Sequence, residues 1–172
     1  EVTGADVHFV CVGTPQRRDG LAADLTYLEA AIDTLAAVLR RPCLVVGKST
    51  VPVGTARRLA THLAEAAPAG DGVELAWNPE FLREGYAVED TLHPNRLVFG
   101  VLSERGERAV SDVYAQVIAA DVPVVVTDFE TAELVKVAAN AFLATKISFI
   151  NAMAEICEVT GADVTKLAAA IG

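Results

Sequence analysis

The 172-residue sequence has little positive charge, few cysteines and no long apolar run. Its 14 Lys and Arg stand against 23 Asp and Glu, which gives a net charge of −9. Nucleic acids and anionic membranes bind basic faces, so the charge argues against both as main partners. No stretch approaches the roughly 18 apolar residues of a membrane span. The N-terminus has neither a starting Met nor a signal peptide, so we expect a segment from within a longer protein.

The three cysteines and three histidines form no metal-binding pattern. Cys11 and Cys43 lie in apolar runs and Cys157 in a helical pattern, so we expect all three to be small buried residues. An odd count without metal-type spacing favours a reducing, cytoplasmic setting. The histidines are scattered singly, and no metal site is predicted.

Short apolar runs alternate with segments whose apolar positions recur at helical spacing. Strands are expected at 7–12, 43–47, 73–77, 96–100 and 122–126. Helices are expected at 24–40, 54–66 and 103–118, with Asp24 and Ser103 as N-caps. Pro123 indicates that the last strand lies at an edge of the sheet. This order predicts an α/β fold with a mostly parallel sheet and helices on both faces.

The pattern changes after residue 127. From Asp128 to about Thr160 neither a strand nor a proline interrupts the sequence, which predicts one helix. A helix of about 30 residues is about 45 Å long, more than a small domain needs, so we expect it to link two domains. Gly161 ends this helix, and another follows at 163–170. The predicted domains are therefore an α/β domain over 1–127 and an all-helical segment over 128–172.

The first two strands end in polar or turn-forming residues, where parallel sheets bind ligands. In the segment 12–15, Gly13 allows a ligand to approach the backbone and Thr14 offers a hydroxyl. The segment 47–50, Gly-Lys-Ser-Thr, is similar to a Walker A phosphate loop, but that motif requires glycine where Pro42 stands. The adjacent hydroxyls and the helix opening at 54–55 suit hydrogen bonding to a ribose, a nicotinamide or a reacting oxygen.

The third strand runs into a segment that predicts a short helix. Asn78 can cap it, Pro79 suits its first position, and Gly85 would stop it. Glu80 and Glu84 would then share one face. The pair is either a solvated helix edge or a pair of carboxylates for acid/base work in a cleft.

The long helix carries a lysine and an amide at helical spacing. Lys136 and Asn140 are four residues apart among apolar neighbours. Such a lysine either extends its amine to solvent or lies in a site, where it stabilises an oxyanion.

The order and spacing of these motifs resemble the nucleotide-sugar 6-dehydrogenases. The series is V-G-T-P, K-S-T-V-P-V-G-T, N-P-E-F-L-R-E-G, P-N-R-L-V-F-G and A-E-L-V-K-V-A-A-N-A-F. The resemblance runs from about residue 5 to residue 172. It implies part of a Rossmann-like, NAD-binding domain over 1–127. A long connecting helix and the start of an all-helical central domain, which carries the dimer contact, would then follow over 128–172.

The resemblance implies NAD-dependent oxidation of a sugar C6 alcohol to a carboxylate, using two NAD+ per turnover. The substrate it favours is UDP-glucose, with UDP-glucuronate, a precursor for polysaccharide biosynthesis, as product. The implied catalytic residues are Thr50, Glu80, Glu84, Lys136 and Asn140. The implied NAD contacts are Val12, Gly13, Thr14, Pro15, Gln16, Ser49 and Glu84. The implied contacts of the sugar nucleotide are Glu80, Phe81, Leu82, Arg83, Glu84, Lys136 and Asn140.

The resemblance also implies individual roles. Lys136 would stabilise the oxyanion at C6, and Asn140 would position the same oxygen. Thr50 and Glu84 would lie near the reacting oxygen and a bound water. Glu80 would assist hydrolysis of a thioester intermediate.

Two parts of the family pattern are missing from the sequence. No G-x-G-x-x-G loop occurs, and Cys157 lacks the Gly-rich context of the family's nucleophilic cysteine. The chain therefore resembles the middle of such an enzyme, expected to be cytoplasmic and to dimerise through the long helix. Two alternatives stay open: a dehydrogenase of GDP-mannose, dTDP-glucose or a UDP-N-acetyl-hexosamine, and a truncated, non-catalytic binding or dimerisation module.

Overall fold

The computed structural model describes residues 2–172, with side chains from residue 3 onward. Two compact units divide the chain: the first ends at Lys136, and the second is Val137–Gly172. The strands are β1 (Val7–Val10), β2 (Cys43–Gly47), β3 (Val73–Trp77), β4 (Leu97–Gly100) and β5 (Val124–Thr127). The α-helices are α1 (Thr26–Ala36), α2 (Thr55–Ala66), α3 (Ala87–Leu92), α4 (Glu104–Val113), α5 (Ala115–Ile118), α6 (Phe129–Thr160) and α7 (Val164–Ile171). Short 3₁₀ turns are formed by Val2–Gly4 and Gly70–Gly72.

The five strands form one sheet in the order β1-β2-β3-β4-β5. Helix α1 connects β1 to β2 and α2 connects β2 to β3, and both strand pairs are parallel. Strand β4 runs antiparallel to β3 and pairs with it only through Trp77 and Gly100. The segment between these strands contains only the six-residue helix α3, too short to return the chain to the start of the sheet. Strands β4 and β5 are again parallel.

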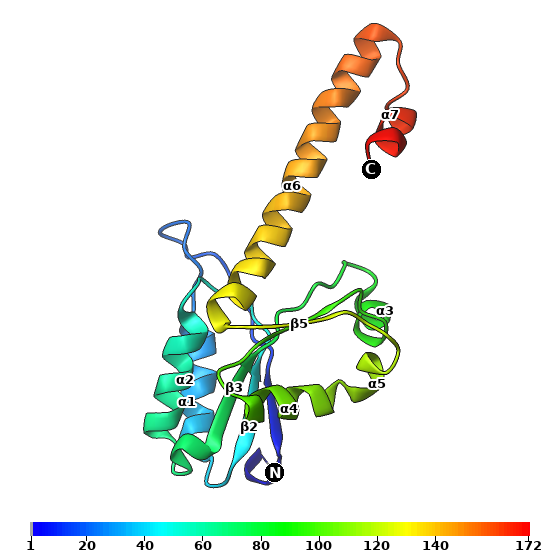
Figure 1. Ribbon diagram of the computed structural model, residues 1–172. Coiled ribbons are helices and arrows are strands. Elements are labelled where there is room, and N and C mark those ends of the chain that lie inside the picture. Colours follow the sequence, from blue (N-terminus) through cyan, green and yellow to red (C-terminus); the bar gives the residue numbers. More distant parts are fainter. Residues whose placement is uncertain (1) are drawn as a thin grey trace. The chain divides into compact units, whose positions relative to one another are not determined.

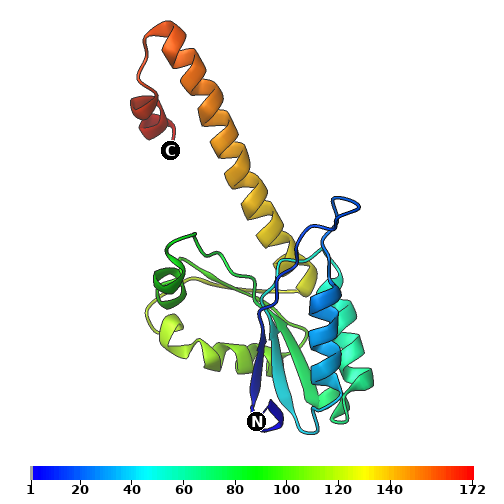
Figure 2. The ribbon, with the colours of Figure 1, turned by 180° about the vertical axis from the view of Figure 1, so that it is seen from behind.

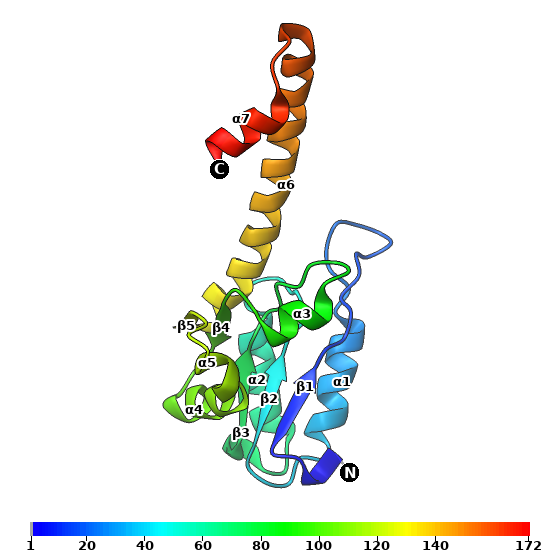
Figure 3. The same ribbon diagram turned by 90° about the vertical axis from the view of Figure 1, so that its right-hand side faces the viewer.

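The helices cover both faces of the sheet, which confirms the predicted α/β class (Figures 1 and 2). Helices α1 and α2 lie on one face and α4 on the other, while β1 forms an outer edge (Figure 3). Strand β5, which follows Pro123, forms the other outer edge, which confirms the predicted edge position.

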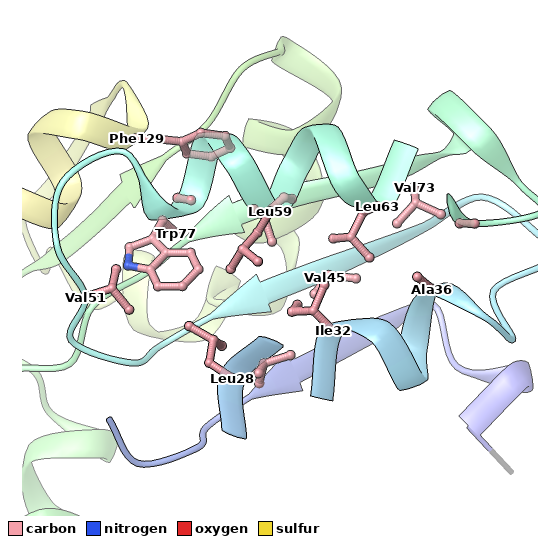
Figure 4. Packing of buried hydrophobic residues seen from close by; sticks show 14 of the residues in the cluster. Leu28, Ile32, Ala36, Val45, Val51, Leu59, Leu63, Val73, Trp77 and Phe129 are labelled. Carbon is pink, nitrogen blue, oxygen red and sulfur yellow. The ribbon is translucent and has the colours of Figure 1, made fainter. Parts of the chain in front are cut away.

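Successive side chains along the strands point to opposite faces of the sheet, where they form two hydrophobic cores. Val45 of β2 faces the larger core, where Leu28 and Ile32 of α1 meet Leu59 and Leu63 of α2 (Figure 4). The smaller core on the opposite face contains, from the strands and α4, Leu44, Val46, Ala76, Leu97, Phe99 and Val110. Strands β2 and β4 are thus buried along their whole length, which explains why they read as continuous apolar runs.

Two of the predicted helices differ in extent from those in the structure. The helix expected over 103–118 breaks at Tyr114 into α4 and α5, although Ser103 does cap α4 by accepting a hydrogen bond from the Gly106 N–H. Helix α1 begins at Thr26, two residues after Asp24, whose carboxylate accepts bonds from the N–H and hydroxyl of Thr26. It ends at Ala36, although we expected it to reach residue 40.

The cysteines are free thiols, but only two are buried as expected. Cys43 and Cys157 are buried, whereas Cys11 is exposed. Side chains alternate along an extended chain, and Val10 faces the core, so Phe9 of β1 and Cys11, the residue after β1, lie on the opposite side. Phe9 is 44% exposed there. An apolar run at an edge strand therefore does not imply that all of its side chains are buried, and the predicted burial of Cys11 was wrong.

Helix α6 covers the expected length but belongs to both units. Its first two turns, residues 129–136, pack within the first unit, where Phe129 and Ala132 are fully buried. The sequence-based division at 127/128 therefore assigns these turns to the helical segment, whereas the compact units divide after Lys136. In the second unit, Gly161 adopts a φ of +75° after α6, and Asp163 caps α7.

By length and composition alone, α6 could cross a membrane. Its most apolar 18-residue window has a mean hydropathy of 1.3. The helix contains no unbroken apolar run of that length, but this window tolerates up to two charged residues. Helices of soluble proteins pass the same test, so the property by itself is weak evidence for a membrane span.

Candidate functional site

The loops that follow β1 and β2 are tied together at the carboxyl edge of the sheet. The Oγ of Ser49 donates a hydrogen bond to the backbone oxygen of Val12 at 2.6 Å. The Oγ1 of Thr14 donates to the backbone oxygen of Thr50, also at 2.6 Å. Each hydroxyl donates its only hydrogen to the neighbouring loop, so each hydroxyl oxygen can still accept a hydrogen bond from a ligand. The structure thus brings together the predicted cofactor residues of both loops.

The loop after β1 offers its backbone to a ligand. Gly13 is exposed, and a Cβ built on it meets no atom within 4 Å. Pro15 and Gln16 are exposed as well, and the Gln16 side chain donates to the Gly20 oxygen at 2.9 Å. Open space beside Gly13 permits the close approach that the sequence predicts.

Lys136 and Glu80 form an ion pair at the same edge. The Nζ of Lys136 lies 3.0 Å from the Oε1 of Glu80, and the lysine is buried. Burial raises the pKa of Glu80, but the N–H of Leu82 and the charge of Lys136 outweigh it and hold the pKa below its ordinary value. The same Nζ lies 5.5 Å from the centre of the Phe81 ring. The Lys136 amine therefore does not extend to solvent but lies buried in an ion pair.

The short helix predicted after β3 does not form. Residues 78–83 are extended or irregular, and the helix in this region is α3, which starts at Ala87. Glu80 and Glu84 therefore do not share a helix face: Glu80 is half-buried against Lys136, and Glu84 is exposed. Instead of a solvated carboxylate pair, the segment presents one carboxylate to the lysine.

Arg83 anchors the end of this segment to α3. Its backbone N–H and its guanidinium donate to the carboxylate of Asp90, with distances from 2.6 to 3.2 Å. The Arg83 guanidinium holds the pKa of the Asp90 carboxyl below its usual range. Leu82, the remaining predicted substrate contact of the segment, is 40% exposed. The guanidinium is thus already paired and closes the loop from residue 83 to residue 90.

Asn78 holds a buried polar network, which replaces the predicted capping role. Its Nδ2 donates to the Val98 oxygen at 3.0 Å, while its Oδ1 accepts from Lys48 at 2.8 Å and from Tyr114 at 2.6 Å. Burial lowers the pKa of Lys48 and raises the pKa of Tyr114 to about 12. The lysine of the apparent Walker motif is therefore used inside the fold, which agrees with the rejection of a phosphate loop.

Glu133, which the sequence analysis missed, occupies the N-terminus of α2. Its Oε2 accepts from the Gly54 N–H and its Oε1 from the Ala56 N–H, both at 2.6 Å. The helix opening that we expected to face a ligand is thus filled by a side chain of the same protein. The only sequence signal was an acidic residue one helical turn before Lys136 in an apolar segment.

Asn140 belongs to the second unit, where it is exposed on α6. The first unit therefore assembles Ser49, Thr50, Glu80 and Lys136 with the loop after β1. A parallel β1–β3 core with polar loops gathered at its carboxyl edge is the arrangement by which α/β domains bind small ligands.

Comparison with known proteins defines the family. Residues 1–118 match the NAD binding domain of the UDP-glucose/GDP-mannose dehydrogenase family, and residues 130–172 match its central domain. The chain therefore belongs to the UDP-glucose/GDP-mannose dehydrogenase family, as its motifs predict.

Individual relatives agree with this assignment. The UDP-glucose 6-dehydrogenase of Rhizobium meliloti is 46% identical over 173 residues, covering 99% of this chain and 39% of the relative. A solved UDP-glucose dehydrogenase from Pyrobaculum islandicum is 43% identical with a TM-score of 0.89, covering 99% of this chain and 39% of that one. A GDP-mannose dehydrogenase from Pseudomonas aeruginosa has the same TM-score and coverage at 29% identity. The chain thus spans about two fifths of the length of these relatives.

Proposed function

We propose that the full-length protein containing this chain oxidises the C6 alcohol of UDP-glucose to a carboxylate with NAD+, yielding UDP-glucuronate. The observation that carries the proposal is the buried Lys136 amine, 3.0 Å from Glu80, at the ligand-binding edge of a domain from this family. A buried cation at this edge stabilises negative charge on a reacting oxygen far better than an amine in water. The higher identity to UDP-glucose dehydrogenases than to the GDP-mannose enzyme supports the choice of substrate.

The proposed roles of the chain's residues are those that the family resemblance implies. Lys136 stabilises the developing oxyanion at C6, and Glu80 holds the amine in place and assists the later hydrolysis. Thr50, on the loop after β2, lies near the reacting oxygen. We assign the exposed Glu84 to a bound water and the cofactor, and Asn140 to the orientation of the C6 oxygen.

The residues present fit NAD, which accepts a hydride when it is bound. Gly13 leaves space for a planar ring at the backbone, and the oxygens of Thr14 and Ser49 remain free to accept from amide groups. Val12, Pro15 and Gln16 complete the proposed cofactor loop. Because Glu133 fills the N-terminus of α2, the pyrophosphate would not bind there.

The test is NADH formation by the full-length protein with a panel of sugar nucleotides. We expect two NADH per UDP-glucose and a clear preference for this substrate. The isolated 172 residues should form none, because they lack the G-x-G-x-x-G loop and the nucleophilic cysteine. Absence of NADH from every sugar nucleotide would favour a non-catalytic binding module.

A second candidate is the oxidation of GDP-mannose or a related sugar nucleotide. It is favoured by the fold comparison, because the GDP-mannose dehydrogenase superimposes as well as the UDP-glucose enzyme. The same substrate panel decides: a kcat/KM higher for GDP-mannose than for UDP-glucose would replace the first proposal with this one.

We further propose a homodimer formed through α6. Five large apolar side chains of its second-unit part are 52–67% exposed in the single chain: Phe142, Leu143, Ile147, Phe149 and Ile156. Large apolar side chains exposed in this number on one helix favour a protein interface. Sedimentation of the full-length protein should give twice the monomer mass.

A cytoplasmic location is proposed from the three free thiols.

A further inference from the structure

Both carboxylate oxygens of Glu133 are fixed by backbone groups of another helix. Glu133 is 1% exposed, on the second turn of α6. It accepts 2.6 Å bonds from Gly54, just before α2, and from Ala56, the second residue of that helix. These N–H groups have no partner within their own helix, and the positive end of the α2 dipole favours a carboxylate there. The contact therefore joins α6 to α2 at one defined point.

The same turns of α6 carry the lysine of the proposed site. Lys136 follows Glu133 by three residues, about 4.5 Å along the helix axis. Nearby, a side chain on Gly100 would overlap the methyl group of Ala132, so helix and sheet approach closely. A shift of this segment would thus carry the Lys136 amine away from Glu80.

Glu133 also fixes the segment that bears the site hydroxyls. Gly54 ends the loop that follows β2, and Ser49 and Thr50 belong to this loop. One carboxylate is thereby joined to both the hydroxyl-bearing loop and the lysine-bearing helix. Both carboxylate oxygens accept from the backbone of Gly54 and Ala56. Glu133 therefore acts on the site through the loop and the helix that it joins.

We propose that Glu133 is a positioning residue: its two hydrogen bonds to the N-terminus of α2 hold Lys136 against Glu80 for the proposed oxidation. The inference rests on the proposed function, since the lysine is positioned for that reaction. Burial raises the pKa of Glu133, which its two backbone donors oppose.

The test uses Glu133→Gln in the full-length protein. Glutamine keeps the size of the side chain, but its NH₂ group faces one of the two backbone donors. We expect kcat to fall at least about 10-fold with KM for UDP-glucose within about 2-fold, because a displacement of about 1 Å can cost about 100-fold. The freed Lys136 amine should acylate several-fold faster, as measured by peptide mass spectrometry.

The matched control is Arg57→Ala. Arg57 pairs with Glu130, so it also joins α2 to α6, but the pair is partly exposed. Exposed pairs contribute at most about 1 kcal/mol, so kcat and Lys136 acylation should stay at the wild-type values. If Glu133→Gln does not fold, Glu133→Asp supplies the test, since it keeps the charge and withdraws the carboxylate by one methylene.

Three outcomes overturn the inference. The first is an unchanged kcat in the Glu133 variant, even with a lower Tm. The second is a reduced kcat with unchanged Lys136 acylation, since the loss would then not pass through the lysine. If the wild-type enzyme forms no NADH, the proposed function fails, and the acylation of Lys136 alone decides whether Glu133 positions the lysine. The third outcome is then an equal rate of Lys136 acylation in the wild type and in Glu133→Gln.

Discussion

The indole ring of Trp77 occupies the space that a side chain on Gly47 would need. The two residues are register partners in β3 and β2, and a Cβ on Gly47 would overlap three carbons of the ring. Trp77 is 1% exposed in the larger core and cannot move aside without opening it (Figure 4). Glycine is thus required here by packing between strands, immediately before the loop that carries Ser49.

We therefore expect Gly47→Ala to destabilise the fold by about 3 kcal/mol or more, the upper range for overpacking a core. Denaturant unfolding of the 172-residue chain measures the change. Gly13→Ala is the matched control, because its Cβ would meet nothing, and its free energy of unfolding should change by about 0.5 kcal/mol or less. In the full-length protein the control should instead weaken NAD binding, and equal destabilisation by both changes would contradict this account.

Replacing Lys136 by methionine should lower kcat of the full-length enzyme by about 100- to 1000-fold. The apolar stem is retained, but the charge that stabilises the oxyanion is lost. Steady-state NADH formation measures the effect. Lys166→Met, at an 87% exposed lysine of α7, controls for loss of positive charge. A Lys136→Met enzyme with normal turnover would exclude the proposed catalytic role.

The Asn78 network should contribute strongly to stability. Asn78→Leu removes the Oδ1 that accepts from Lys48 and Tyr114 and the Nδ2 that donates to the Val98 oxygen. Lys48 keeps the backbone oxygen of residue 78 and the Tyr114 hydroxyl oxygen as acceptors, but the Tyr114 hydroxyl and the Val98 oxygen lose their partners, and unpaired buried groups cost about 1–3 kcal/mol each. We expect a total loss of about 3 kcal/mol in urea unfolding. The double variant with Tyr114→Phe should lose less than the sum of the single losses, because the hydroxyl already lacks its partner in Asn78→Leu. Additive losses would show that the two residues act independently.

The raised pKa of Tyr114 predicts a loss of stability at alkaline pH. Burial moves it from 10.0 to about 12, so between these values the folded chain keeps a proton that the unfolded chain releases. Stability must therefore fall as pH rises through this window. The tyrosinate absorbance of the folded chain should contain a component that titrates near pH 12, absent from Tyr114→Phe. A variant with the same titration curve as the wild type would refute the assignment.

Sequence periodicity predicted most of the first unit because its central strands are buried on both faces and its helices are amphipathic. The helix predicted after Asn78 was wrong. An asparagine followed by proline is a strong helix start, yet its amide finds Lys48, Val98 and Tyr114, far away in the sequence. Tertiary hydrogen bonds of this kind leave no mark on local spacing.

The candidate site was predicted residue by residue but not as pairs. Helical spacing suggested that Glu80 belongs with Glu84, and Lys136 with Asn140. The structure pairs Glu80 with Lys136 across the edge of the sheet. The partner of a charged residue depends on how loops and helices meet, so a single sequence suggests candidate members and leaves their contacts open.

The two anchor points of α6 also set a limit on the length of the chain between them. Glu133 is held at α2 and Lys136 at Glu80, with three residues of helical rise from one to the other. Each residue of an α-helix turns it by about 100°. Deleting one residue between the anchors would point the lysine about 100° away from its carboxylate while leaving composition and hydropathy almost unchanged. In this short stretch, the count of residues is as strictly constrained as their identity.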